Sequence, residues 1–258
     1  MKRHSLNSTA SRRSHSDWEI YLTTSDLSLY SRVIHCYYNR NTTTMRIVNL
    51  VSITPKAEEL IAYCARVSNP SNQLNTESER LLKYLIKHKH WSPFEMAHMV
   101  LEINTTRAIA AQILRHRSFS FQEFSQRYAE VSMMAFATPP ELRRQDTKNR
   151  QNSINDLDPD LTRLRQQQIE RLYMNSETLY NQLLEDGVAK ECAREILPLG
   201  TPTRLYMSGT IRSWLHYIDL RSANGTQKEH RDVALACAEV LRKQLPNIYS
   251  ACFDIPNP

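Results

Sequence analysis

The sequence has no uninterrupted apolar run long enough to span a bilayer, and no apolar stretch of the kind that a secretory signal carries. We therefore expect a soluble intracellular protein, with the cytoplasm as its compartment. Of its 258 residues, 41% are hydrophobic and 23% are charged, as in ordinary globular proteins. That length accommodates one domain with a substantial core, with or without a tail.

The five cysteines form no CxxC pair, which argues against a zinc ribbon or a dithiol redox centre. Their number is odd and their spacing is wide, so we expect reduced thiols, most of them filling the core. His90 and His98 could suggest a metal site, but a proline turn separates them and no ladder of Cys or His residues supports them. The sequence therefore predicts no bound metal.

The chain is basic, with a net charge of +6. This favours anionic partners, which include nucleic acid, acidic surfaces and phosphorylated small molecules. Residues 1–44 hold six Lys or Arg and three Asp or Glu, so they carry +3 of that charge. The rest of the chain is only mildly basic and does not concentrate aromatic and basic residues in one element, so nucleic acid is a disfavoured partner.

Residues 1–44 are rich in Ser, Thr and Arg and show no helical or strand period. We interpret them as an N-terminal extension, either a disordered tail or a start assigned upstream of Met45. This interpretation is preferred to a weak organelle-targeting segment. Residues 45–258 are then expected to form the folded domain.

Hydrophobic patterns predict strands and helix starts in the first half of this domain. The apolar residues of 46–53 predict a strand, and the alternation over 97–104 predicts a second strand with one buried face. Thr54 followed by Pro55 predicts an N-cap with proline in the first turn. Residues 76–79 predict a capping box that opens another helix.

The second half is predicted to be helical. A helix is expected from about Thr106 to Arg115, with Leu114 among its inward-facing residues. Residues 141–160 are polar and predict a surface excursion. From Leu161 onward the pattern predicts helix after helix, the last of them across 233–241. One of these helices would bury Ile211, Trp214, Leu215 and Ile218, with Arg212 and His216 one turn apart on the face away from the core. The outline is an α+β domain, a small antiparallel or mixed sheet with several surrounding helices.

Residues 112–127, QILRHRSFSFQEFSQR, carry the most chemical information. Gln112 and Arg115 lie three apart and would share a helix face. Arg115 to Arg117 would place three donor-rich side chains at a helix end, where the helix dipole alone also favours cations. Glu123, Ser125 and Arg127 stand at every second position, so in an extended loop their side chains would point the same way. Arginine forks with amide and hydroxyl donors suit a phosphate ligand.

Arg115-His116-Arg117 followed by seven residues and Ser125 matches the signature of flavin-dependent thymidylate synthases. Further segments match that family in the same order. These segments are Ala65–Ser68, His90–Glu95, Ala193–Pro198 and Leu220–Arg221, with Gln227 and Glu229 beyond. The chain resembles this family from about Met45 to its C-terminus. The family's sheet-and-helix catalytic domain agrees with the α+β outline.

The resemblance implies methylation of dUMP to dTMP, with FAD as cofactor, NADPH as reductant and methylenetetrahydrofolate as one-carbon donor. The implied dUMP-binding residues are Gln112, Arg115, Glu123, Ser125, Gln126, Arg127, Arg194 and Arg221. The implied FAD-binding residues are Ser68, Ser92, Arg115, His116, Arg117, Glu123, Thr210, Arg212 and His216. The family is a homotetramer with active sites at subunit interfaces, so one site would take residues from several chains.

The resemblance casts Arg221 as the catalytic residue, a fixed cation that stabilises negative charge developing on the uracil. No cysteine follows a proline, as the nucleophile of the other class of thymidylate synthase normally does. Ser125 has no adjacent base to activate it, which favours a positioning role. Two positions depart from the family: Gly225 stands where many relatives have histidine, and His216 where some have asparagine.

Two other functions are compatible with parts of the sequence. The first is a basic nucleic-acid-binding module, which should lose its ability to retain nucleic acid when residues 1–44 are removed. A degenerate relative would bind FAD or nucleotide without turnover, although the main signature positions are intact. Turnover that depends on dUMP separates the enzyme from both.

Overall fold

The computed structural model describes residues 47–134 and 137–254, and the predicted N-terminal extension lies outside them. The strands are β1 (Val48–Ile53), β2 (His98–Thr106), β3 (Ser120–Glu123), β4 (Arg144–Gln145), β5 (Ser153–Ile154) and β6 (Pro202–Thr210). The α-helices are α2 (Ala57–Ala65), α3 (Glu79–Lys87), α4 (Arg107–Ile113), α5 (Pro159–Glu185), α6 (Lys190–Ala193), α7 (Ile211–Ser222), α8 (Lys228–Gln244) and α9 (Pro246–Phe253). Short 3₁₀ helices are η1 (Pro70–Asn72), η2 (Ser92–Met96), η3 (Val131–Met133) and η4 (Arg194–Ile196). None of the helices in these two segments is both long and apolar enough to cross a membrane.

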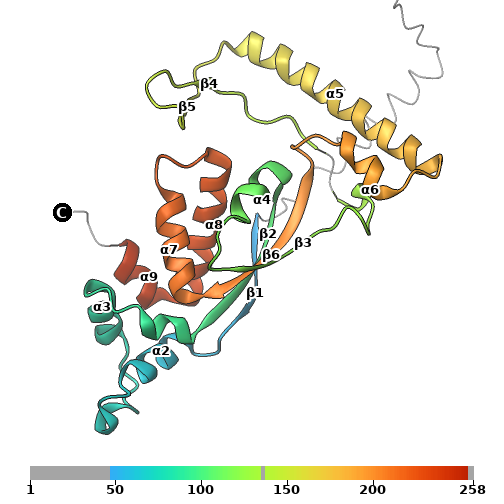
Figure 1. The fold of residues 1–258 in the computed structure, drawn as a ribbon. Helices are drawn as coiled ribbons and strands as arrows, with labels where there is room; N and C mark the ends of the chain where they lie inside the picture. The colour runs from blue at the N-terminus through green and yellow to red at the C-terminus, as the bar shows by residue number, and fades with distance from the viewer. Residues whose placement is uncertain (1–46, 135–136, 255–258) are drawn as a thin grey trace, which may run out of the picture. The chain divides into compact units, whose positions relative to one another are not determined.

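A four-stranded sheet in the order β1-β2-β6-β3 organises the domain. All three pairings are antiparallel, and β2 pairs with β6 over its whole length, with Met99 opposite Gly209. A separate two-stranded ladder joins β4 and β5. In Figure 1, α7 and α8 lie together on one side of the larger sheet. The predicted α+β class with a small sheet is confirmed, and the sheet is antiparallel.

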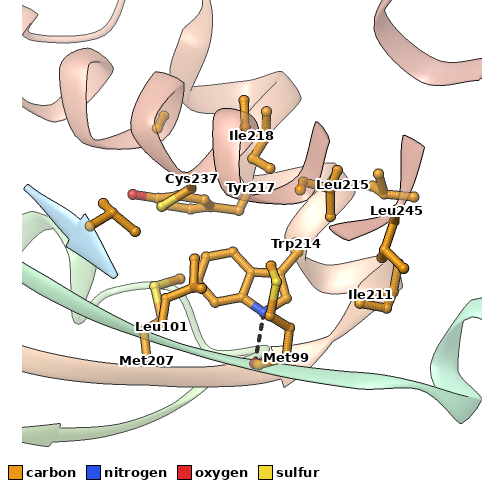
Figure 2. Packing of buried hydrophobic residues seen from close by; sticks show 14 of the residues in the cluster. Met99, Leu101, Met207, Ile211, Trp214, Leu215, Tyr217, Ile218, Cys237 and Leu245 are labelled. Carbon is orange, nitrogen blue, oxygen red and sulfur yellow. Dashed lines mark hydrogen bonds between the residues drawn. The ribbon is translucent and has the colours of Figure 1, made fainter. Parts of the chain in front are cut away.

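The core lies between the sheet and the pair α7 and α8. Met99, Leu101 and Ile103 of β2 are fully buried, as the predicted alternation requires. Trp214 of α7 is also fully buried, and its Nε1 donates a hydrogen bond of 3.0 Å to the carbonyl of Met99. Figure 2 shows this indole pointing from α7 toward the sheet, with Tyr217 beside it. Burying each large apolar side chain stabilises the fold by about 1.5–3 kcal/mol, so α7 is firmly fixed on the sheet.

Strand β6 corrects the prediction that the chain is helical throughout from Leu161. Thr203, Leu205, Met207 and Gly209 are buried in alternation, which is the period of a strand. Strand β6 lies inside the sheet, because it pairs with β2 on one side and with β3 on the other. Helix α9 is a second correction, since it follows α8 and begins with Pro246 in its first turn.

Three helix boundaries also differ from the predictions. Helix α2 begins at Ala57 and not after Thr54, because the Thr54 hydroxyl accepts the backbone N–H of His98 and ties the segment to β2. Helix α3 has no side-chain capping bond, and Glu79 pairs with Lys83. Helix α4 ends at Ile113, so the next residue, predicted to face inward, is 38% exposed.

Helix α5 packs on little of the described chain. Its main contacts with other elements are with α6 and η4, and Tyr180 is its one buried residue. Four leucines share one stripe along it and are exposed: Leu161, Leu164, Leu172 and Leu179. Figure 1 shows this helix, in yellow, apart from the sheet and from α7. The polar excursion predicted for 141–160 is confirmed, and it carries the β4-β5 ladder.

Candidate active site

The basic triplet, Arg115 to Arg117, lies in the connection between α4 and β3. The sequence predicted it at a helix end, and it follows the last residue of α4 closely. Thr106 caps the start of α4 by accepting the backbone N–H of Ile109. The turn that holds His116 is anchored by Phe119, whose ring packs on Trp214 at 4.9 Å between centroids. Gly209 lies under this ring, since a Cβ there would come within 2.5 Å of it. A glycine in the central strand therefore lets the turn approach the sheet.

Arg221, in the last turn of α7, contacts this triplet. Its Nε donates a hydrogen bond of 2.9 Å to Nε2 of His116. Burial, followed by the nearby charges of Arg221, His216 and Arg115, lowers the pKa of His116 to about 4. The imidazole is therefore neutral at pH 7 and uses Nε2 as an acceptor.

No carboxylate in the described ranges lies within ion-pair distance of Arg221. Among the residues that the structure describes, a neutral histidine is its only hydrogen-bonding side chain, which leaves the guanidinium charge uncompensated there. Such a cation, fixed at a helix end and partly buried, is suited to stabilise a developing negative charge on a ligand.

A cavity of about 610 Å³ opens beside α7. It is lined by Ile86, Trp91, Glu95, Ser118, Arg212, Ser213, Leu215, His216, Asp219, Cys252 and Phe253. Arg212 and His216 both line it, as expected for residues one turn apart on the helix face away from the core. Aromatic and aliphatic walls, with both basic and acidic side chains among them, suit a large aromatic ligand that carries polar groups.

Glu95 of η2 holds one of these basic residues in place. Its carboxylate accepts a hydrogen bond of 2.7 Å from Arg212. A hydrogen bond with Thr210, followed by the contact with Arg212, lowers the pKa of Glu95 despite its partial burial. Thr210 also caps α7 by accepting the backbone N–H of Ser213. Ser92 begins η2 next to the cavity residue Trp91 but does not itself line the cavity.

Glu123 ends β3 and is held by two neighbours. Its Oε1 accepts from Arg107 at 2.8 Å and from the Thr203 hydroxyl at 2.9 Å. The extended backbone stops there, because the carbonyl of Ser125 accepts the N–H of Tyr128 and begins a turn. The predicted alternation from Glu123 to Arg127 is therefore wrong, and these side chains need not point the same way.

Arg127 and Arg194 converge on one residue of α6. Arg127 forms an ion pair of 2.9 Å with the carboxylate of Glu191, and Nε of Arg194 donates to the backbone carbonyl of the same residue. Gln126, next to this group, is buried. Figure 1 places α6 and α9 on opposite sides of the sheet. Within one chain, the predicted nucleotide contacts Arg127 and Arg194 therefore lie apart from the cavity.

Ser68 is the predicted site residue that the structure leaves apart from all these groups. It is exposed in the loop after α2, and no described hydrogen bond joins it to another predicted site residue. Its neighbour Arg66 is buried and donates to the backbone carbonyls of Asn75 and Glu77. This arginine therefore shapes the loop.

Sequence reasoning missed a buried pair behind Gln112. The amide oxygen of Gln112 lies 3.3 Å from Nδ1 of His230, and Nε2 of that histidine lies 3.1 Å from the hydroxyl of Tyr217. Gln227 and Glu229, known from the sequence only as parts of a matching segment, continue this contact outward. The buried position of His230 on α8, one turn before the apolar Val233, was the available signal.

The described cysteines, Cys64, Cys192, Cys237 and Cys252, are free thiols. Among residues 47–134 and 137–254, no three His, Cys, Asp or Glu side chains are grouped so that they could hold a metal ion. Besides these thiols, the ionisable groups of the described site are arginines, histidines and carboxylates.

Comparisons with known proteins agree with this geometry. Residues 49–247 match the model of the family described as thymidylate synthase complementing protein, Thy1. A probable flavin-dependent thymidylate synthase of Paramecium bursaria Chlorella virus 1 is 60% identical over 196 residues, which cover 76% of this chain and 90% of that protein. The flavin-dependent thymidylate synthase of Synechocystis sp. is 53% identical over 194 residues, covering 75% and 88%.

A similar solved structure is a UMP/dUMP methylase, PolB, from Streptomyces cacaoi, bound with 5-Br dUMP. Its TM-score is 0.69 at 28% identity, and the match covers 79% of this chain and 93% of that one. The fold and site thus define an α+β protein with cationic side chains around a signature turn and beside a partly apolar cavity. The chain belongs to the flavin-dependent thymidylate synthase family.

Proposed function

We propose that this protein methylates dUMP to dTMP, using methylenetetrahydrofolate as one-carbon donor and NADPH as reductant through FAD. The observation that carries the proposal is Arg221, an uncompensated guanidinium held at 2.9 Å by the neutral imidazole of His116 within the signature turn. The class of reaction follows from the family to which the chain belongs.

The residues around the 610 Å³ cavity fit a flavin dinucleotide. Trp91 and Phe253 supply apolar walls, and Arg212, oriented by Glu95, supplies guanidinium N–H donors for a phosphate. FAD, when bound, supplies the redox chemistry that joins NADPH oxidation to methyl transfer. We assign the binding of FAD to Ser68, Ser92, Arg115, His116, Arg117, Glu123, Thr210, Arg212 and His216. Their task is to hold and orient the cofactor and to exclude water.

For dUMP we assign binding to Gln112, Arg115, Glu123, Ser125, Gln126, Arg127, Arg194 and Arg221. Arg127 and Arg194 both contact Glu191, so their guanidinium groups are held in one place, where their N–H donors can be presented to a phosphate. Arg221 stabilises negative charge on the uracil during the reaction, because its own charge has no carboxylate partner in the described chain. Ser125 positions the nucleotide and is not a nucleophile.

We further propose that the enzyme is a homotetramer whose active sites form between subunits. Two observations support this arrangement. The predicted nucleotide contacts near α6 and the cavity beside α9 form separate groups within one chain. The four exposed leucines on α5 form an apolar stripe that another subunit would cover. The cytoplasm is the proposed compartment, with residues 45–258 as the catalytic domain and residues 1–44 as an extension.

A spectral titration tests the site directly. The full chain is loaded with FAD, and the visible flavin absorbance is recorded as dUMP is added. Our proposal expects a saturable change in the flavin bands, since the two ligands share one site. An Arg221→Lys variant keeps a cation but loses the planar fork, so it should bind dUMP more weakly. Flavin bands that stay unchanged at saturating dUMP would contradict the proposed site.

A further inference from the structure

Tyr217 of α7 and His230 of α8 form a polar pair inside the helical core. Both side chains are 0% exposed. The Tyr217 hydroxyl lies 3.1 Å from Nε2 of His230, and Nδ1 of His230 lies 3.3 Å from Oε1 of Gln112. Buried polar groups are retained where their hydrogen bonds are satisfied, as they are here. The roles proposed above use neither residue.

The direction of each hydrogen bond follows from the outer end of the chain. The carboxylate of Glu229 can only accept, so the amide nitrogen of Gln227 donates to it at 2.9 Å. The oxygen of Gln227 then accepts from the amide nitrogen of Gln112 at 2.7 Å. The oxygen of Gln112 is therefore turned inward, where it accepts from His230.

The inner end gives the same assignment. Burial lowers the pKa of His230 to about 4, so at pH 7 the imidazole carries one proton. Because Nδ1 donates to Gln112, that proton is on Nδ1, and Nε2 accepts from the hydroxyl of Tyr217. Every bond from Tyr217 to Glu229 thus donates in the same direction. Arg143, 11% exposed, fixes the outer end by donating to Glu229 at 2.6 Å.

We propose that Tyr217 and His230 are positioning residues that hold the amide of Gln112 as a hydrogen-bond donor to an oxygen of dUMP. This inference depends on the proposed function, in which Gln112 contacts the nucleotide. The second amide N–H of Gln112 has no partner within the described chain, so it is available to a ligand. If the inner bonds were lost, only the bond to Gln227 would orient the amide, so its second N–H would be held less firmly toward an oxygen of the ligand.

The test compares variants of the full chain loaded with FAD. Tyr217→Phe removes the hydroxyl that fixes the histidine tautomer, and His230→Leu removes the donor to Gln112. Each should raise the KM for dUMP about fivefold to tenfold, as expected for one net hydrogen bond. The kcat and the KM for NADPH should stay within about twofold. His230→Asn should restore much of the dUMP affinity, because its amide N–H can occupy the place of Nδ1.

Tyr180→Phe is the matched control. This tyrosine is equally buried, and its hydroxyl accepts the backbone N–H of Val131, far along the chain from α7. It should leave the KM for dUMP within about twofold of the wild type. An equal KM change in Tyr180→Phe and Tyr217→Phe, or none in either, overturns the positioning role.

A measurement on the wild-type protein keeps the inference testable where a variant does not fold. The ¹⁵N shifts of the His230 ring should show a protonated Nδ1 and an unprotonated Nε2 at pH 7. The opposite tautomer overturns the inference. If wild-type protein forms no dTMP, the proposed function itself fails. If it forms dTMP but the KM for dUMP is insensitive to these variants, only the positioning role fails.

Discussion

Acidification should destabilise this fold, and the buried histidine on α8 gives a defined part of that effect. His230 is fully buried, and its pKa is lowered from 6.5 to about 4 by burial, with the charges of Arg221 and His116 adding to the effect. The folded protein binds this proton more weakly than the unfolded chain does. The contribution of the neutral imidazole to the free energy of unfolding is therefore complete above pH 6.5. That contribution is lost as the pH falls from 6.5 toward 4.

The size of the effect follows from these two pKa values. Between pH 8 and pH 5, proton binding by the unfolded chain lowers the free energy of unfolding by about 2 kcal/mol for this one group. In His230→Asn that part of the pH dependence should disappear. His116, whose pKa is also lowered, remains in both proteins and cancels in the comparison.

Urea unfolding at pH 8, 7, 6 and 5, at one protein concentration and followed by tryptophan fluorescence, measures this difference. His88→Asn is the control, because His88 is an exposed histidine at the end of α3. The control should keep the wild-type pH dependence. If His230→Asn loses stability between pH 8 and pH 5 as steeply as the wild type does, the assignment of a neutral buried imidazole is refuted.

Three further variants test other parts of the structure. Gly209→Ala places a Cβ within 2.5 Å of the Phe119 ring, so it should lower the free energy of unfolding by about 1–3 kcal/mol in urea unfolding, and an unchanged midpoint would contradict the close contact. Burial raises the pKa of Glu177 to about 7, so its destabilising effect grows as the pH rises from 4.5 through 7. Glu177→Gln should therefore raise the thermal midpoint more at pH 8 than at pH 5. An equal change at both pH values would contradict the raised pKa of Glu177. Ser125→Ala should keep dTMP formation while raising the KM for dUMP, whereas a complete loss of turnover with intact dUMP affinity would assign Ser125 a chemical role.

The sequence predicted the parts of the fold whose hydrophobic period is strong. The alternation across β2 and the helical spacing in α7 both identified the buried residues correctly. Strand β6 was missed although its residues alternate, because it stands between helical segments. Its identity as a strand depends on pairing with β2 and β3, which lie far away in the sequence. Such long-range pairing leaves only a weak local pattern.

The site shows the same division between local and long-range information. The signature turn and the spacing of Arg212 and His216 were readable from neighbouring residues. The ion pair of Arg127 with Glu191 and the contact of Arg221 with His116 join residues 64 and 105 positions apart. No spacing rule connects such positions.

Turnover of the purified full chain tests the central claim most directly. Protein is incubated with FAD, NADPH, methylenetetrahydrofolate and dUMP, and dTMP is quantified by chromatography, with each component omitted in turn. Our account predicts dTMP in the complete mixture and none when dUMP or methylenetetrahydrofolate is left out. NADPH oxidation without any dTMP, from protein that binds FAD, would contradict the assignment of a thymidylate synthase.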